Sequence, residues 1–126
     1  MFKQIFANSV YIKVYQNRFD LRQIESGVTA TVVSSNTFST SRILVGHFVE
    51  ADTILRKGMK QLHKDKWFTP KPVVIIQPME KTEGGLSQVE ERILKELATG
   101  AGARKTLVWV GHELSDNEVI EKLYGV

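Results

Sequence analysis

The stretch Pro72-Val73-Val74-Ile75-Ile76-Gln77-Pro78 decides the fold class. Its four central residues are all apolar and all β-branched, a composition that favours a strand over a helix. A strand with one face in water would alternate apolar and polar residues, and this one does not. We therefore expect a parallel strand that is covered by helices on both faces of the sheet.

Helical patterns lie on both sides of this strand. Before it, apolar residues recur at intervals of three and four: Ala51, Ile54, Leu55, Gly58, Met59 and Leu62. After it, a capping box at Ser87 and Glu90 predicts a second helix that ends at Gly100. We expect that helix to bury the apolar residues Leu86, Val89, Ile93 and Leu97. A second capping box, at Ser115 and Glu118, predicts a last helix.

The first third of the chain has the alternating pattern of strands. Three such runs lie between Val10 and Val33, separated by a polar break and by a turn at Gly27, and they predict an antiparallel meander. The polar loop Ser34–Ser41 follows. The run Thr106–Val110 predicts one more buried strand, with Trp109 in the core.

The predicted order is therefore β-β-β-α-β-α-β-α. With no internal repeat and no linker, it indicates a single α/β domain over residues 1–126, with a mixed five-stranded sheet. The composition agrees, because 42% of the 126 residues are hydrophobic and the net charge is only +3. We find no transmembrane segment and no signal-peptide core, so we expect a cytoplasmic protein.

Residue types exclude several chemistries. The chain has no Cys, which removes thiolate metal sites, iron–sulfur clusters and a cysteine nucleophile. The histidines His47, His63 and His112 are far apart in sequence and are more typical of surface or capping residues than of metal ligands. The glycines of Gly100-Ala101-Gly102 follow a helix and precede a strand, the reverse of a phosphate-binding loop. We therefore expect no catalytic residues, no metal and no cofactor.

Two stretches are candidate binding surfaces. The densest basic stretch, with two aromatic residues beside it, comprises Arg56, Lys57, Lys60, Lys64, Lys66, Trp67 and Phe68, with Lys71 shortly after. Cations beside aromatic rings can hold an acidic protein, a phosphate backbone or an anionic membrane, although most charged helix faces are simply solvated. At the amino terminus, Phe2, Ile5 and Phe6 share one side of a turn that can contact a membrane or pack on the sheet.

The third candidate surface is the edge of the meander. We assign the edge strand to residues 28–33, where Thr29, Thr31 and Val33 carry no charge that would discourage pairing. We expect a homodimer through this edge or through an uncovered face of the sheet. In the alternative arrangement, the last helix covers that face and the protein is a monomer.

Several motifs resemble MreB, the bacterial actin family that determines rod shape. The similar segments are Leu44–Phe48, Met59–His63, Pro70–Pro78, Gln88–Arg92 and Ala98–Lys105, and the most specific of them contains Gly100-Ala101-Gly102-Ala103-Arg104. Residues 1–6 also resemble the membrane-associating turn of that family. The resemblance implies a ribonuclease-H-like half of an actin fold.

The resemblance also implies a degenerate nucleotide site. Where the family carries an Asp-x-Gly-Thr phosphate loop, this chain has Lys13-Val14-Tyr15-Gln16, and His47 replaces the aspartate before the long helix. The family's paired glutamates fall near Val110 and Gly111. The expected function is therefore a non-enzymatic protein-interaction module linked to a cytoskeletal or envelope-associated assembly. The alternative is a phosphate or nucleic-acid binding module that uses the basic Arg56–Lys71 face.

Overall fold

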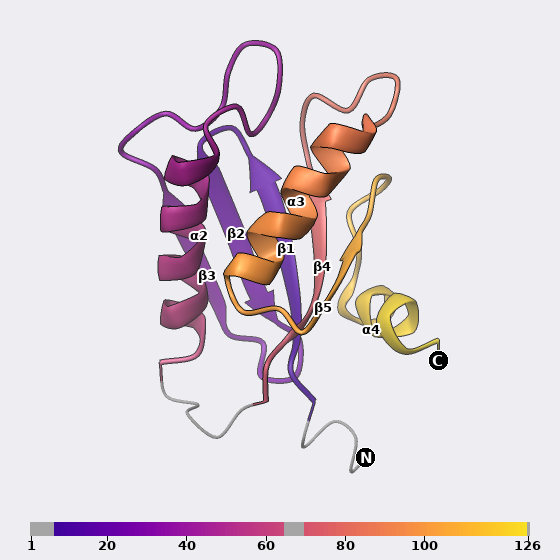
Figure 1. The fold of residues 1–126 in the computed structure, drawn as a ribbon. Helices are drawn as coiled ribbons and strands as arrows, with labels where there is room; N and C mark the ends of the chain where they lie inside the picture. Colours follow the sequence, from indigo (N-terminus) through magenta and orange to yellow (C-terminus); the bar gives the residue numbers. More distant parts are fainter. Residues whose placement is uncertain (1–6, 65–69, 126) are drawn as a thin grey trace.

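The computed structural model describes residues 7–64 and 70–125. Its elements, in chain order, are β1 (Ser9–Tyr15), β2 (Arg18–Gln23), β3 (Thr29–Val33), α2 (Phe48–Leu62), β4 (Val73–Pro78), α3 (Gln88–Gly100), β5 (Lys105–Val108) and α4 (Asp116–Tyr124). The described residues form a mixed five-stranded sheet in the order β3-β2-β1-β4-β5 (Figure 1). β1 to β3 make an antiparallel meander, while β1, β4 and β5 run parallel to one another.

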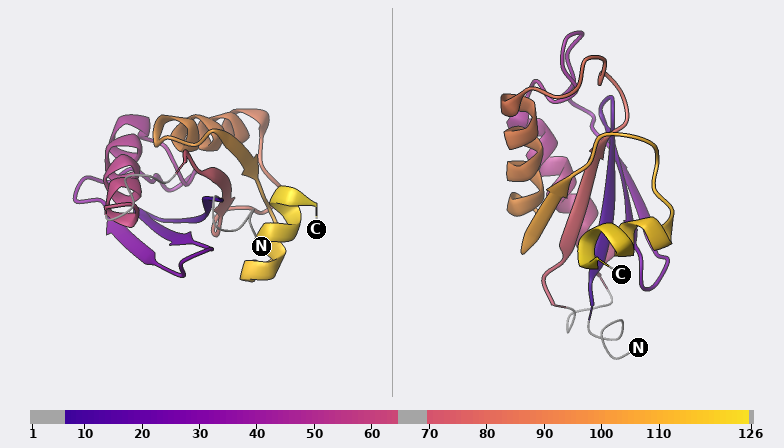
Figure 2. Two further views of the ribbon diagram at one scale, coloured as in Figure 1. Left: turned by 90° about the horizontal axis from the view of Figure 1, so that it is seen from below. Right: turned by 90° about the vertical axis from the view of Figure 1, so that its right-hand side faces the viewer.

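Helices cover both faces of this sheet. α2 and α3 lie side by side on one face, and α4 lies on the other (Figure 2). All residues of β4 are buried, as the uninterrupted apolar run predicts. On the face towards α2 and α3, Val10, Ile12 and Val14 join the main core, whereas Tyr11 and Ile75 pack on the opposite face with residues of the α4 region.

The polar loop after β3 contributes an aromatic residue to the main core. Phe38 is fully buried and stacks on Phe19, with ring centroids 5.0 Å apart. Asn17 holds this loop in place, since its Oδ1 accepts hydrogen bonds from the backbone N–H groups of Phe38 at 2.8 Å and Ser39 at 2.9 Å. The loop therefore closes one end of the core, a role that its composition does not predict.

The strand predicted at Thr106–Val110 is not buried. Among the described strands, β5 pairs only with β4 at the edge of the sheet, and its residues alternate between exposed and half-buried. Leu107 is 38% exposed and Val110 is 40% exposed. Trp109 follows the strand and is half-buried against the smaller core under α4, so its assignment to the core was wrong.

The apolar stripe of α3 also differs from the prediction. Leu94, Leu97 and Ala98 are its buried residues, whereas Val89 is 68% exposed. Val89 precedes Leu94 by five positions, which places it roughly 140° away around the helix at 3.6 residues per turn. Ile93 lies between these directions and is half-buried. Both predicted capping boxes are present, at Ser87 and Ser115.

Replacement of Leu97 by Ala should lower the free energy of unfolding by ~2–5 kcal/mol, because it opens a cavity beneath α3. The matched variant Val89→Ala, on the exposed side of the same helix, should change it by less than ~0.5 kcal/mol. Urea titration of both variants measures the difference. Equal midpoints for the two variants would contradict the observed orientation of α3.

Charged contacts fasten α4 to the sheet. Arg22 on β2 donates to both carboxylate oxygens of Asp116, at 2.9 and 2.8 Å, and this pairing lowers the pKa of Asp116. At the start of α4, the Ser115 backbone N–H donates to Glu118, whose other oxygen lies 2.8 Å from His112 Nε2. The Ser115 bond and then the His112 bond lower the pKa of Glu118 to about 2.

This shift predicts a pH dependence of stability. The folded-state pKa of Glu118, about 2, lies below its ordinary value of 4.5, so the unfolded chain takes up this proton first as the pH falls. The contribution of Glu118 is therefore complete above its unfolded pKa and is lost as the pH falls towards its folded pKa. Glu118→Gln should flatten the pH profile of unfolding in that window, and Glu121→Gln, on the same helix, is the control. Identical profiles for wild type and Glu118→Gln would contradict the prediction.

Candidate functional site

The carboxyl ends of β1 and β4 form the topological switch point of the sheet. The two strands are parallel neighbours, and the chain continues from β1 towards β2 on one side and from β4 towards β5 on the other. Open α/β sheets bind ligands in the crevice at this position. The segment Lys13-Val14-Tyr15-Gln16 lies here.

At this end of the sheet, a backbone amide and a lysine are each bonded to a carboxylate of the protein itself. The Gln16 backbone N–H, at the turn after β1, donates to Glu80 Oε2 at 2.7 Å. Lys13 Nζ lies 3.0 Å from Glu113 Oε2. Partial burial lowers the pKa of Lys13, but the bond to Glu113 outweighs it and raises the pKa overall. The Lys13 cation at this end of the sheet is therefore already paired with a carboxylate.

A buried hydrogen-bond network lies deeper between the same two strands. Tyr11 is 3% exposed and Gln77 is fully buried, and the Tyr11 hydroxyl donates to Gln77 Oε1. The same hydroxyl accepts the Leu114 backbone N–H at 3.0 Å, while Gln77 Nε2 donates to the carbonyl of Gly111 at 2.8 Å. Desolvation by burial raises the pKa of Tyr11. Sequence reasoning missed both residues, because they lie within apolar strands.

The histidines take separate places. His112 pairs with Glu118, His63 lies at the end of α2, and His47 is the exposed residue before that helix. Within residues 7–64 and 70–125, no group of three or more His, Asp or Glu residues could hold a metal ion.

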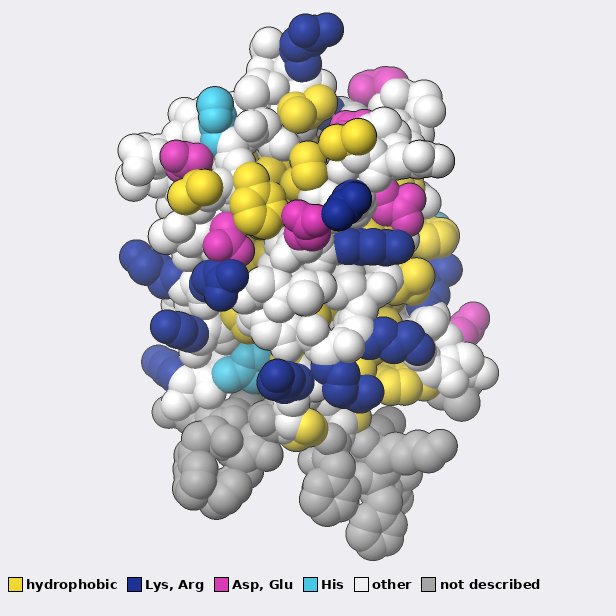
Figure 3. Space-filling view, viewed as in Figure 1, with side chains coloured by type: hydrophobic (Ala, Val, Ile, Leu, Met, Phe, Trp, Pro, Cys, Tyr) yellow, Lys and Arg dark blue, Asp and Glu magenta, His cyan; other side chains and the backbone are white. Residues whose placement is uncertain are grey.

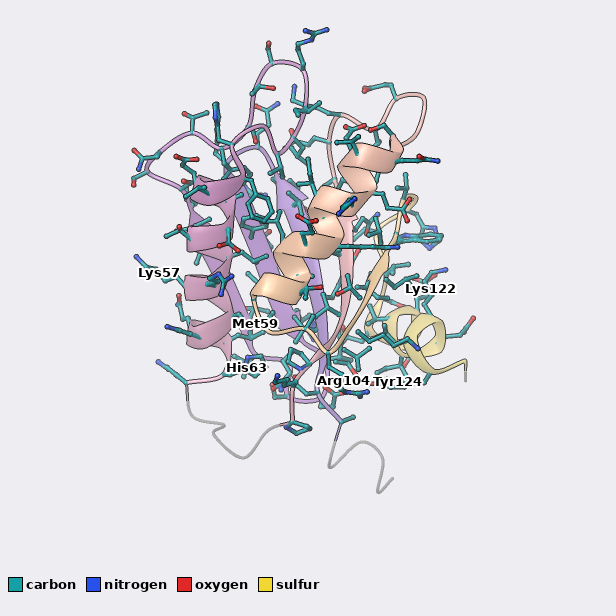
Figure 4. The ribbon with its side chains drawn as sticks, in the orientation of Figure 1. Lys57, Met59, His63, Arg104, Lys122 and Tyr124 are labelled. Carbon is teal, nitrogen blue, oxygen red and sulfur yellow. The ribbon has the colours of Figure 1, made fainter. Side chains whose placement is uncertain are left out.

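The predicted basic stretch lies partly on α2. Arg56, Lys57 and Lys60 are exposed there, and Lys64 follows the helix. Figure 3 shows Lys and Arg side chains along this side and at the lower end of the face that carries α2 and α3. Lys57 projects away from α3 (Figure 4). The other members of the stretch, Lys66, Trp67 and Phe68, lie outside the described residues.

A cavity of about 400 Å³ lies between the ends of α2 and α3 and the segment that enters β4. Among the described residues that line it, the basic side chains are Arg56 and Lys60 from α2, His63 after it and Lys71 before β4, and none of these lining residues carries a carboxylate. The Asp52 carboxylate lies against Gly100, which also lines the cavity. Arg56 Nε bonds Asp52 at 2.9 Å, and its guanidinium lies against Gly100 at the end of α3, where a Cβ atom would be 2.9 Å from Nη2. The cavity thus has a surplus of positive charge.

A fixed polar group forms one wall of this cavity. Asn8 is 3% exposed; its Nδ2 donates to the Pro70 carbonyl at 2.8 Å and its Oδ1 accepts from Gln23 Nε2 at 2.9 Å. His63 Nε2 lies 3.2 Å from the same Oδ1, and its Nδ1 lies 2.9 Å from the Met59 carbonyl. These bonds hold Asn8 and His63 in one arrangement.

The predicted edge strand is an edge of the sheet. β3 pairs only with β2 among the described strands, and Thr29, Thr31 and Val33 are exposed, Val33 by 64%. Ala30 and Val32 point the other way and are buried under α2. The backbone N–H and C=O groups on the outer side of β3 therefore face away from the sheet, beside a row of uncharged side chains.

The amino-terminal candidates Phe2, Ile5 and Phe6 lie outside the described residues. Within the part of the chain that the structure describes, none of the helices has the length and apolar character needed to cross a membrane.

Comparison with known proteins finds a relative along almost the whole chain. The uncharacterized protein YjaA of Escherichia coli (strain K12) is 34% identical over 123 residues, which covers 90% of this chain and 95% of that protein. No protein-family model matches the chain.

Proposed function

This chain belongs to the same family as YjaA, and we propose that it is a non-enzymatic binding module built on a ribonuclease-H-like scaffold. The scaffold assignment is supported by the strand order β3-β2-β1-β4-β5, in which an antiparallel meander is followed by two parallel strands. That is the order expected of one half of an actin fold. The link to MreB, and through it to a cytoskeletal or envelope-associated assembly, rests on sequence resemblance.

The observation that carries the proposal is the state of the switch point. Nucleotide hydrolysis there would need an open backbone amide for phosphate and a carboxylate for a metal ion. Instead, the Gln16 amide is bonded to Glu80 and Lys13 is paired with Glu113. Removal of even one transition-state donor costs about 10²–10³ in rate, and here the backbone N–H donor is occupied and a lysine stands in place of a metal-binding carboxylate.

We place the interaction surface on the exposed edge of β3. Unpaired backbone groups of an edge strand are a template for another strand, and proteins that avoid such pairing place charges, Pro or bulges there. The sequence of β3, Thr29–Val33, has none of these. β-branched residues opposite one another stabilise antiparallel pairs, so a second copy of this chain or a strand of another protein fits this edge.

The first test is of nucleotide binding. No phosphate should be released from Mg-ATP, and any calorimetric heat of Mg-ATP binding should be the same for the wild type and Lys13→Gln, because the groups at the switch point are already bonded. Glu80→Gln, which removes the carboxylate that accepts the Gln16 backbone N–H, should not restore hydrolysis, because Lys13 remains. If the wild-type protein hydrolysed ATP and Lys13→Gln abolished that hydrolysis, the proposal would be overturned.

The second test is of self-association. Sedimentation at high micromolar concentration should show a dimer, and Thr31→Lys should shift it to a monomer of about 14.3 kDa. The control is Thr53→Lys, which adds the same charge on an exposed part of α2 away from the strand edge. A wild-type monomer would contradict the proposed self-association. A dimer that Thr31→Lys leaves intact would show that the interface is not the β3 edge.

A further inference from the structure

We infer that the cavity between the ends of α2 and α3 binds a small phosphate ester of about mononucleotide size. It lies near the amino end of β4, whereas the closed switch point lies at the carboxyl end of the same strand. The inference is therefore independent of the proposed interaction through β3.

The charge of the cavity favours a dianion. Lys60 and Lys71 are exposed cations on different elements that both line it, and neither is paired with a carboxylate among the described residues. Lys60, in the last turn of α2, also complements the negative end of that helix. Lys71 has no such role, because it precedes β4. A phosphate group placed between them would gain two charge-assisted hydrogen bonds.

Several carbonyls at the helix ends that border the cavity are already hydrogen-bonded. At the end of α3, the Leu97, Ala98 and Thr99 carbonyls already accept the backbone N–H groups of the following residues. At the end of α2, the Met59 carbonyl accepts the backbone N–H of His63 at 3.2 Å. Such capping weakens the negative potential that an open helix end would direct into the cavity.

Asn8 supplies a directional group. An amide NH₂ carries two donors, and within the described residues this one has the Pro70 carbonyl as its acceptor. The second N–H belongs to a buried side chain that lines the cavity and that Gln23 holds in place. The cavity, at about 400 Å³, is within the ~300–1,000 Å³ of small-molecule sites. It is too small for a folded protein partner.

The experiment is calorimetric titration of the whole chain, at low ionic strength, with adenosine monophosphate, inorganic phosphate and adenosine. Adenosine monophosphate should bind saturably, phosphate should compete with it, and adenosine should not bind. Lys60→Gln and Lys71→Gln should each weaken binding roughly ten-fold, the value of one lost charge-assisted bond. Lys57→Gln, on the same helix but directed away from α3, should change affinity less than roughly two-fold.

Other outcomes would overturn the inference. They are the absence of saturable binding, equal binding of adenosine, failure of phosphate to compete, or an equal effect of Lys57→Gln. Tighter binding of a single-stranded oligonucleotide, to which Lys57, Lys60 and Lys71 contribute equally, would indicate an extended nucleic-acid surface instead of a cavity site. All three lysines are exposed, so unchanged thermal midpoints should accompany each variant.

Discussion

The second face of the sheet depends on the hydrogen bond between Tyr11 and Gln77. These side chains come from adjacent parallel strands and are buried, so either one alone would leave an unsatisfied polar group at a cost of about 1–3 kcal/mol. Together they also bind the backbone at Gly111 and Leu114. That backbone leads directly into α4. The polar pair therefore positions the segment that leads into α4, the helix whose Val119 lies in the small core with Tyr11.

Features that depend on residues close together in the sequence could be predicted, whereas features that depend on distant residues could not. Both capping boxes were predicted, because Ser and Glu three residues apart meet within one helical turn. The buried positions of Phe38 and Gln77 were not predicted, because each depends on partners far along the chain. Phe38 stacks on Phe19 and its backbone N–H donates to Asn17, and Gln77 accepts a hydrogen bond from Tyr11. β4 and the edge position of β3 were predicted correctly. An apolar run cannot show whether its strand has one neighbour or two, which is why β5 was misassigned.

The same limit applies to the candidate site. The sequence identified Arg56, Lys60 and Lys71 as part of a basic stretch, but the cavity also needs Asn8, which lies far from α2 along the chain. Charge is arranged differently at the two ends of the sheet. At the carboxyl end, Glu80 and Glu113 already satisfy the backbone amide and the lysine. At the amino end, Lys60 and Lys71 line the cavity, and neither has a carboxylate partner among the described residues. An anion arriving from solution therefore meets paired groups at one end and exposed lysines at the other.

α2 joins the two proposed binding surfaces. One side of this helix presents Arg56 and Lys60 to the cavity, while Gly58 packs against the sheet, where a Cβ atom would lie 3.1 Å from both Leu21 and Val32. Val32 belongs to the edge strand β3. Glycine inside a helix costs about 1 kcal/mol relative to alanine, and here it allows an approach that a larger side chain would oppose. Because close-packed interiors resist small displacements, the contact at Gly58 couples the position of the edge strand to that of the helix that carries the cavity lysine.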